Sequence, residues 1–149
     1  MAELEKKCMP VSSIMTVEPV CVDPNTSVKD AVRLLHDHKI RHLPVTGPAG
    51  NVRGLVSNRD MLVAHMRVRR DALYTERLVA PIMTREVDCI APDACAYAAA
   101  RYMYTHKRGC LLVVKEDLLV GILTESDFVK AFAGGSACSC QAAIEQNSD

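Results

Sequence analysis

The chain has 149 residues, of which 49% are hydrophobic and 24% are charged, and its formal net charge is zero. These values exclude a chain that is disordered over most of its length, and they predict one ordinary domain or two small modules with a shared core. The balanced charge gives no general argument for nucleic acid or acidic membranes as partners, and no apolar run approaches the ~20 residues that cross a bilayer.

The elements of the first half follow from apolar periodicity and turn residues. Pro24 ends a short strand, and Asn25, Thr26 or Ser27 can cap the helix that follows. In chain order we expect a helical turn at residues 11–15, a short strand at 20–22, a helix at 28–38, a buried strand at 40–46, a partner strand at 52–56 and a helix from 58 to about 68. The order is β-α-β-β-α.

The pattern then restarts, which is the signature of an internal repeat. The Ile-Met-Thr of residues 14–16 returns at 82–84. At the same spacing Cys89 matches Cys21 and Pro92 matches Pro24, while His106 and Lys107 match His38 and Lys39.

The second repeat therefore predicts the same elements as the first. Asp93 takes the capping position of a helix at residues 94–106, and a closing helix at about 125–132 ends at Gly134 and Gly135. The predicted domains are residues 11–68 and 78–134, with flexible termini at 1–10 and 135–149.

One seven-residue motif occurs in both halves, at residues 54–60 and 121–127. Each copy has a glycine, two apolar residues, a hydroxyl residue, two variable residues and an aspartate. A hydroxyl and an acid at this spacing form a capping box, which needs no ligand. The same helix N-terminus also suits a phosphate, and the carboxylate can accept hydrogen bonds from two adjacent ribose hydroxyls. Both interpretations stay open at this point.

The seven cysteines have irregular spacing, and no secretory signal precedes them. We interpret them as reduced thiols of a cytoplasmic protein, most of them small core residues. Cys138 and Cys140 lack a second ligand pair, which argues against a metal site. His36 and His38 are two positions apart on a helix and do not share a face, which argues against a metal site formed by these histidines.

The basic cluster at residues 67–70 favours a solvated helix end, where cations suit the helix dipole. The alternative is a docking patch for phosphate, nucleic acid or a partner. Tyr97, Tyr102 and Tyr104, on the first helix of the second repeat, are expected to be packing residues. With no Trp and few aromatic residues, the chain offers no stacking platform for single-stranded nucleic acid.

The β-α-β-β-α unit, with Ile-Met-Thr at its head, Lys-Ile-Arg-His-Leu-Pro-Val at residues 39–45 and the seven-residue motif at its end, resembles a CBS domain, the module named after cystathionine beta-synthase. Two copies resemble a CBS pair, or Bateman module, over residues 11–133. The resemblance implies an α/β (α+β) fold with two repeats packed as a pseudo-two-fold pair and two clefts between them. The second repeat departs from the pattern at Leu112, which replaces the proline, and at 108–110, Arg-Gly-Cys, where the first has Arg-His-Leu at 41–43.

The resemblance also implies ligands, which in such clefts are commonly AMP, ADP, ATP, S-adenosylmethionine or dinucleotides such as NAD. Arg41 and Arg108 are the expected phosphate partners, because a guanidinium binds phosphate oxygens in a fork. One cleft would use Thr16, Cys21, Ile40, Arg41, His42, Ile122, Thr124, Ser126 and Asp127. The mirror cleft would use Leu55, Ser57, Arg59, Asp60, Thr84, Cys89, Arg108, Gly109 and Cys110.

We therefore predict a regulatory module that senses an adenosine-containing ligand and signals to a separate, unidentified protein. A homodimer is implied by the resemblance. We predict no catalytic residue, metal or required cofactor, because no motif places a Ser/His/Asp or Cys/His arrangement. An enzyme remains the second hypothesis. The third is a scaffold or nucleic-acid-binding module that has empty clefts and acts through residues 67–70.

Overall fold

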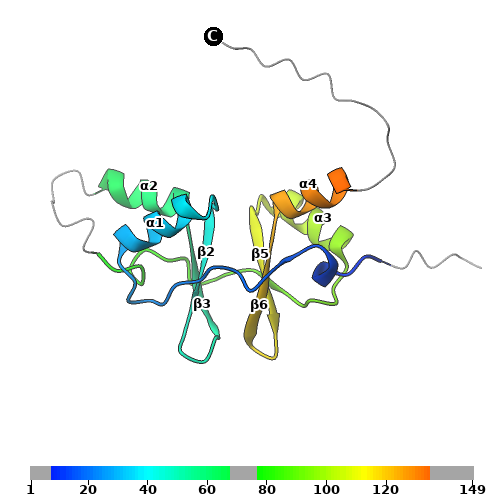
Figure 1. Cartoon of the computed structure of the whole chain (residues 1–149), viewed down its shortest axis with the longest axis horizontal. Coiled ribbons are helices and arrows are strands. Elements are labelled where there is room, and N and C mark those ends of the chain that lie inside the picture. Colours follow the sequence, from blue (N-terminus) through cyan, green and yellow to red (C-terminus); the bar gives the residue numbers. More distant parts are fainter. Residues whose placement is uncertain (1–7, 68–76, 135–149) are drawn as a thin grey trace, which may run out of the picture.

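The structure is a computed structural model, and it describes residues 8–67 and 77–134. Its α/β fold consists of two similar halves side by side, with the helices of both on the same side of the hairpins (Figure 1). Within the described ranges, no helix has the length and apolar character needed to cross a membrane. In chain order the elements are the 3-10 turn η1 (Val11–Ser13), β1 (Thr16–Val17), α1 (Val28–Asp37), β2 (His42–Thr46), β3 (Val52–Ser57), α2 (Asn58–Arg67), β4 (Cys89–Ile90), α3 (Ala96–His106), β5 (Cys110–Lys115), β6 (Leu118–Thr124) and α4 (Glu125–Gly134).

Helix α1 shows why the sequence forms these elements. The hydroxyl of Ser27 accepts a hydrogen bond from the backbone N–H of Asp30 at 3.1 Å, as an N-cap does. Val28, Ala31 and Leu35 lie on one face of the helix and are buried in the core that contains the apolar side chains of β2 and β3. Of the three residues predicted as possible caps, Ser27 is the one that caps the helix. The sequence spacing also placed Val32 on the apolar face, but Val32 is 43% exposed.

Two antiparallel hairpins, β2–β3 and β5–β6, form the centre of the molecule. The second hairpin extends into a four-stranded sheet in the order β1-β6-β5-β4. Strand β1 pairs antiparallel with β6, and β4 runs parallel to β5. The first hairpin remains a two-stranded sheet.

A single proline explains why the strand predicted at residues 20–22 is wrong. Only Val22 pairs there, through an isolated bridge to β2. In the second repeat the N–H of Leu112 donates to the carbonyl of Asp88 at 3.1 Å. The hairpin registers place Pro44 where the second repeat has Leu112. Because proline has no N–H, the corresponding hydrogen bond cannot form in the first repeat.

The segment that leads into each repeat packs on the other repeat. Val11 is buried in the core of the second repeat, and Val79 is buried in the core of the first. The N–H of Val11 donates to the carbonyl of Ala94, and the N–H of Val79 donates to the carbonyl of Thr26, both at 2.8 Å. In Figure 1 the stretch with η1 lies beside α3 rather than beside α1. Each repeat is therefore completed by the lead-in of the other.

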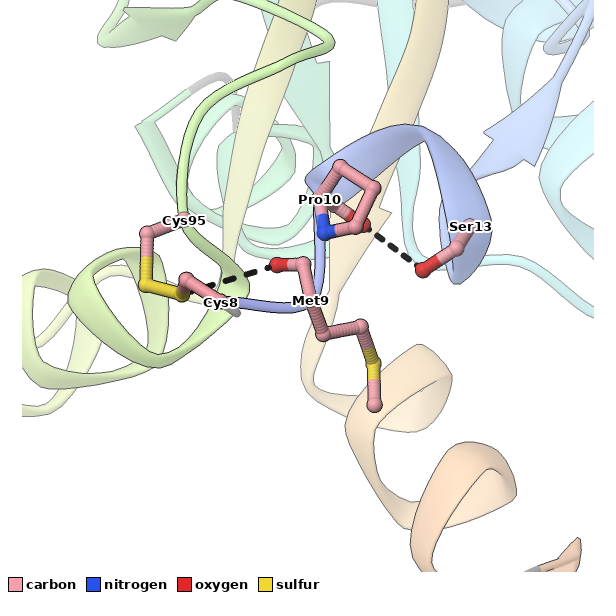
Figure 2. Close-up of a disulfide and its surroundings, with 5 residues drawn as sticks. All are labelled: Cys8, Met9, Pro10, Ser13 and Cys95. Atoms are coloured by element: carbon pink, nitrogen blue, oxygen red, sulfur yellow. Dashed lines mark hydrogen bonds between the residues drawn. A yellow bond between two sulfur atoms is a disulfide. The ribbon is translucent and has the colours of Figure 1, made fainter. Parts of the chain in front are cut away.

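A disulfide joins Cys8 to Cys95, so the expectation that all cysteines are reduced is wrong (Figure 2). It ties the first lead-in segment to the start of α3, where the N–H of Ala96 donates to the carbonyl of Met9 at 2.8 Å. Cys95 is also the N-cap of α3 and makes no side-chain capping bond, so the cap predicted at Asp93 is wrong. The carbonyl of Met9 thus satisfies one of the N–H groups at the start of α3 that have no acceptor within the helix.

The other described cysteines do not share one environment. Cys110 is buried, whereas Cys21 and Cys89 are exposed. The prediction that most cysteines are core residues is therefore wrong for the described ones, and Cys138 and Cys140 lie outside the described residues.

The tyrosines of α3 are on the surface, which contradicts their predicted packing role. Tyr97, Tyr102 and Tyr104 are 68%, 38% and 77% exposed. Tyr102 stacks on the ring of His106 with 4.2 Å between the centroids, and the ammonium of Lys107 lies 4.5 Å from the ring centre of Tyr104.

Candidate functional site

The seven-residue motif ends a strand and begins a helix in both repeats. Ser57 ends β3 before α2, and Thr124 ends β6 before α4. The backbone N–H of each hydroxyl residue donates to the aspartate three positions on, at 2.7 Å for both Asp60 and Asp127. The hydroxyls donate to the same carboxylates at 2.9 and 3.0 Å. The N–H of Asp60 donates back to the hydroxyl of Ser57 at 3.2 Å, which completes the predicted capping box in the first copy. In the second copy the bonds from Thr124 to Asp127 form the half of the box in which the acid is the acceptor.

A cavity of about 240 Å³, the first cleft, lies beside the copy of the motif that starts α4. Asp127 is only 8% exposed, and its second carboxylate oxygen accepts a hydrogen bond from the hydroxyl of Thr16 at 3.0 Å. Cys21 and Asp127 are the residues predicted for this cleft that do not line it. The predicted residues that do line it are Thr16, Ile40, Arg41, His42, Ile122, Thr124 and Ser126.

A cavity of about 350 Å³, the second cleft, lies beside the copy of the motif that starts α2. No hydrogen bond joins Thr84 to Asp60 within the described residues, so the contact between Thr16 and Asp127 has no mirror image. His42 lines this cleft as well as the first. The other predicted residues that line it are Leu55, Ser57, Arg59, Asp60, Thr84, Arg108, Gly109 and Cys110.

Charged side chains that sequence reasoning missed also line the clefts. Lys39 lines the first and Lys107 the second, and Glu18 and Glu86 are related in the same way. Both pairs keep the spacing of the repeat, so comparing the two halves position by position gives the signal that identifies them. The remaining missed residues are Pro19, Val20 and His38 in the first cleft and Val87 and Asp88 in the second.

The two arginines proposed as phosphate partners are held differently. Arg108 pairs with Asp88 at 2.7 Å, whereas Arg41 lies 3.6 Å from Glu125. The Arg41 pair is exposed on both sides, so solvent screens it and it contributes little stability. The guanidinium of Arg41 is therefore the more available of the two.

The strand registers correct the equivalence inferred from the sequence. His42 pairs with Ser57, and Cys110 pairs with Thr124, so His42 and Cys110 occupy the same place in their repeats. Gly109 is then the counterpart of Arg41. The sequence-based match of Arg108 to Arg41 is therefore wrong by one position. Arg108 is adjacent to Gly109, the true counterpart of Arg41, and this neighbouring arginine favoured the shifted alignment.

Cys89 also differs from its predicted place. It lines a third cavity of about 440 Å³ between β4 and α3, together with Cys95 of the disulfide. Partial burial raises the pKa of the Cys21 and Cys89 thiols, and burial, with a smaller effect of Asp88, raises the pKa of Cys110 to about 12. Thiols with raised pKa values are poor nucleophiles at neutral pH. The free thiols of the described residues thus show none of the activation that thiol catalysis requires.

Two further sequence-based hypotheses can be placed on the structure. In residues 8–67 and 77–134, no group of three or more His, Cys, Asp or Glu side chains is arranged to hold a metal ion. The basic cluster begins at the last residue of α2. Residues 68–70 lie outside the described ranges.

Solved structures share this fold along most of both chains. A Vibrio cholerae protein described as an acetoin utilization protein, AcuB, is 36% identical, with a TM-score of 0.79 over 85% of this chain and 91% of that one. CBSX2, solved in complex with AMP, is 29% identical, with a TM-score of 0.73 over 83% and 96%. The CBS domain pair of protein MJ0100, solved with 5-methylthioadenosine and S-adenosyl-L-methionine, is 25% identical, with a TM-score of 0.74 over 85% and 98%.

Curated relatives include much longer enzymes. A homoserine O-acetyltransferase of Methanosalsum zhilinae is 29% identical over 87% of this chain, but the match covers only 25% of the enzyme. The chain thus spans a quarter of the length of that relative. The family model described as "CBS domain" matches residues 11–67 and again residues 79–134. With two matches that together cover most of its length, the chain belongs to the CBS-domain family and carries its domains as a tandem pair.

Proposed function

We propose that the protein is a regulatory module that binds an adenosine-containing ligand in one or both clefts and passes the bound state to a separate protein. The observation that carries this proposal is the pair of related clefts, each beside a capped helix start and each lined by cationic side chains. The complexes of CBSX2 with AMP and of MJ0100 with S-adenosyl-L-methionine support it by likeness of fold. AMP, ADP, ATP, S-adenosylmethionine and NAD are the candidate ligands.

The side chains of each cleft suit different parts of such a ligand. The carboxylate of Asp60 lines the second cleft, and that of Asp127 is bonded to Thr16 and Thr124 in the lining of the first. Both suit the ribose hydroxyls, because a carboxylate accepts hydrogen bonds from two adjacent donors. The N-termini of α4 and α2 suit phosphate oxygens, with Arg41 as the available guanidinium in the first cleft. In the first cleft a ribose must replace the hydroxyl of Thr16 on Asp127.

No catalytic step is proposed. The curated enzymes match this chain over 14–27% of their length, so their activities belong to proteins that contain much more than a CBS pair. The regulated partner is proposed to be a separate chain, and ligand acts through its different affinities for two states of the module.

The test is a thermal-shift and calorimetric titration with the five candidate ligands. A ligand at about 100 times its dissociation constant stabilises the native state by about 2.7 kcal/mol, which raises the Tm. Asp60→Asn and Asp127→Asn should weaken binding while an amide oxygen keeps the helix cap, whereas Ala would also cost about 1 kcal/mol of cap stability. Asp37→Asn, at the end of α1 and outside both clefts, is the matched control. Absence of heat from every adenine compound at millimolar concentration would refute the proposal.

A further inference from the structure

His42 is the only described residue that lines both clefts. It begins β2, at the point where the two repeats meet. Its side chain is half-buried. A ligand in either cleft therefore lies next to the same imidazole.

The position of the ring depends on Gly109, which precedes β5 in the second repeat. A Cβ at Gly109 would lie 3.2 Å from both Cε1 and Nε2 of His42. This spacing is closer than ordinary van der Waals contact, so any larger residue at 109 would displace the ring. The glycine gives the imidazole room to reach the second cleft.

The second repeat supplies no matching ring. Cys110 occupies the place of His42 in that repeat, and its buried thiol lines only the second cleft. The two clefts therefore share one titratable ring rather than having one each.

Charged groups of several elements act on this ring. Burial lowers the pKa of His42, and the guanidinium of Arg41 lowers it further, while Glu125 of α4 and Asp60 of α2 raise it by smaller amounts. Without ligand the ring is therefore neutral near pH 7. The other titratable groups that line the clefts are Glu18, His38 and Lys39 in the first and Arg59, Glu86, Asp88, Lys107, Arg108 and Cys110 in the second.

We propose that His42 couples the two clefts: an anionic ligand in one cleft favours the charged ring, and the charged ring favours an anionic ligand in the other. This inference rests on the proposed function, because it requires ligands in the clefts. It goes beyond that function by naming the residue through which one cleft senses the other. The ligand class is a phosphate-bearing adenosine compound.

The sign of the coupling follows from when the ring takes up its proton. The first phosphate adds negative charge beside a neutral ring, so part of its binding free energy is used to take a proton from solvent. The second phosphate meets a ring that is already charged and avoids this cost. Coupling is therefore positive and reciprocal at neutral pH, and it disappears at a pH low enough to charge the ring before any ligand binds.

The direct test follows the ring protons of His42 by NMR through a pH titration, with and without saturating AMP. In Asp127→Asn, which weakens the first cleft, AMP in the second cleft should still raise the pKa of His42. His38 lines only the first cleft and is the internal control, so its ring signals should not change on addition of AMP to this variant. An unchanged pKa of His42 with AMP bound in the second cleft would overturn the coupling.

Calorimetry gives the second test. At pH 7.5 the second AMP should bind at least about 5-fold more tightly than the first after statistical correction, in the usual range of coupling between sites. In His42→Gln this ratio should fall to about one, while His36→Gln, at an exposed residue outside both clefts, should keep it. An unchanged ratio in His42→Gln, or saturation at one AMP per chain, refutes the coupling and leaves the proposed function intact. If AMP does not bind at all, both the coupling and the proposed binding of AMP are refuted.

Discussion

Gly54 and Gly121 lie where the backbone of the other repeat crosses their strands. A Cβ at Gly54 would lie 2.7 Å from the carbonyl oxygen of Thr84, and one at Gly121 would lie 2.9 Å from that of Thr16. Distances this short leave no room for a side chain. The side chains of Met83 and Met15 also approach, with the sulfur of Met83 at 2.8 Å from the first position and that of Met15 at 2.6 Å from the second. This explains why the repeated motif begins with a glycine, which the capping box alone does not require.

Replacing either glycine should therefore destabilise the fold. Gly54→Ala and Gly121→Ala are each expected to lower the free energy of unfolding by about 1–3 kcal/mol, the usual cost of overpacking. Urea denaturation measures the change. Gly134→Ala is the control, because a Cβ there meets nothing within 4 Å, and it should leave stability nearly unchanged. Equal stability of Gly54→Ala and the parent chain would contradict the close crossing.

The sequence predicted the caps at Ser57 and Thr124 because a capping box is local: the two partners are three residues apart. It did not predict the reason for Gly54, because Thr84 is far along the chain. It also missed the part that His42 plays in both clefts. His42 reaches both clefts because Gly109 has no side chain. The two residues come together only when the repeats pack, so the sequence does not show their contact.

At the scale of elements, the first lead-in segment is held to α3 by two independent means. Backbone hydrogen bonds join Met9 to Ala96 and Val11 to Ala94. The disulfide between Cys8 and Cys95 adds a covalent link (Figure 2). The backbone contacts do not depend on the disulfide, so reduction should loosen the segment without unfolding the repeat.

Cys8→Ser should lower the free energy of unfolding by about 2–4 kcal/mol, because the disulfide closes a long loop and restricts the unfolded chain. The two cysteines are 87 positions apart. Guanidinium denaturation without reductant measures the loss, and dithiothreitol should bring the parent chain to the same stability. Cys21→Ser, at an exposed free thiol, is the control and should change little. A parent chain with the same midpoint in oxidised and reduced form would rule out the bond in solution.

Helices and hairpins were predictable because each shows its apolar periodicity within a short stretch of sequence. The short strands were not. Residues 20–22 looked like a strand, but Pro44 on the partner lacks the necessary donor. Strand β1 was missed because only two residues, Thr16 and Val17, pair with a strand from the other end of the chain. The disulfide likewise has no local signal.

At the scale of the whole molecule, both closing helices carry exposed apolar side chains. Leu62 and Met66 of α2 are 59% and 65% exposed, and Val129 and Phe132 of α4 are 68% and 91% exposed. Helices α2 and α4 lie on the same side of the hairpins (Figure 1). A second copy of the chain that packs on these helices would remove both apolar faces from water.

We therefore expect a homodimer in solution, and its molar mass can be measured by light scattering during size-exclusion chromatography. Phe132→Glu should shift the equilibrium toward monomer at micromolar concentration, because the dimer would bury a carboxylate without a partner. Leu118→Glu is the control: Leu118 is 44% exposed, and it starts β6 at the hairpin end away from the helices. A monomeric parent chain, or a dimer that tolerates Phe132→Glu, would exclude this interface.

The exchange of lead-in segments has a consequence for how the protein is made. Thr16 and Asp127 are 111 positions apart, so at about 5–20 residues per second the ribosome completes the second partner about 5–20 s after the first. Through most of that interval the apolar Val11 has no complete core to enter, whereas Val79, which closes the core of the first repeat, is added about midway. The first repeat can therefore close only after the lead-in of the second has emerged, and the segment with Val11 stays exposed to chaperones until the strands of the second repeat have emerged.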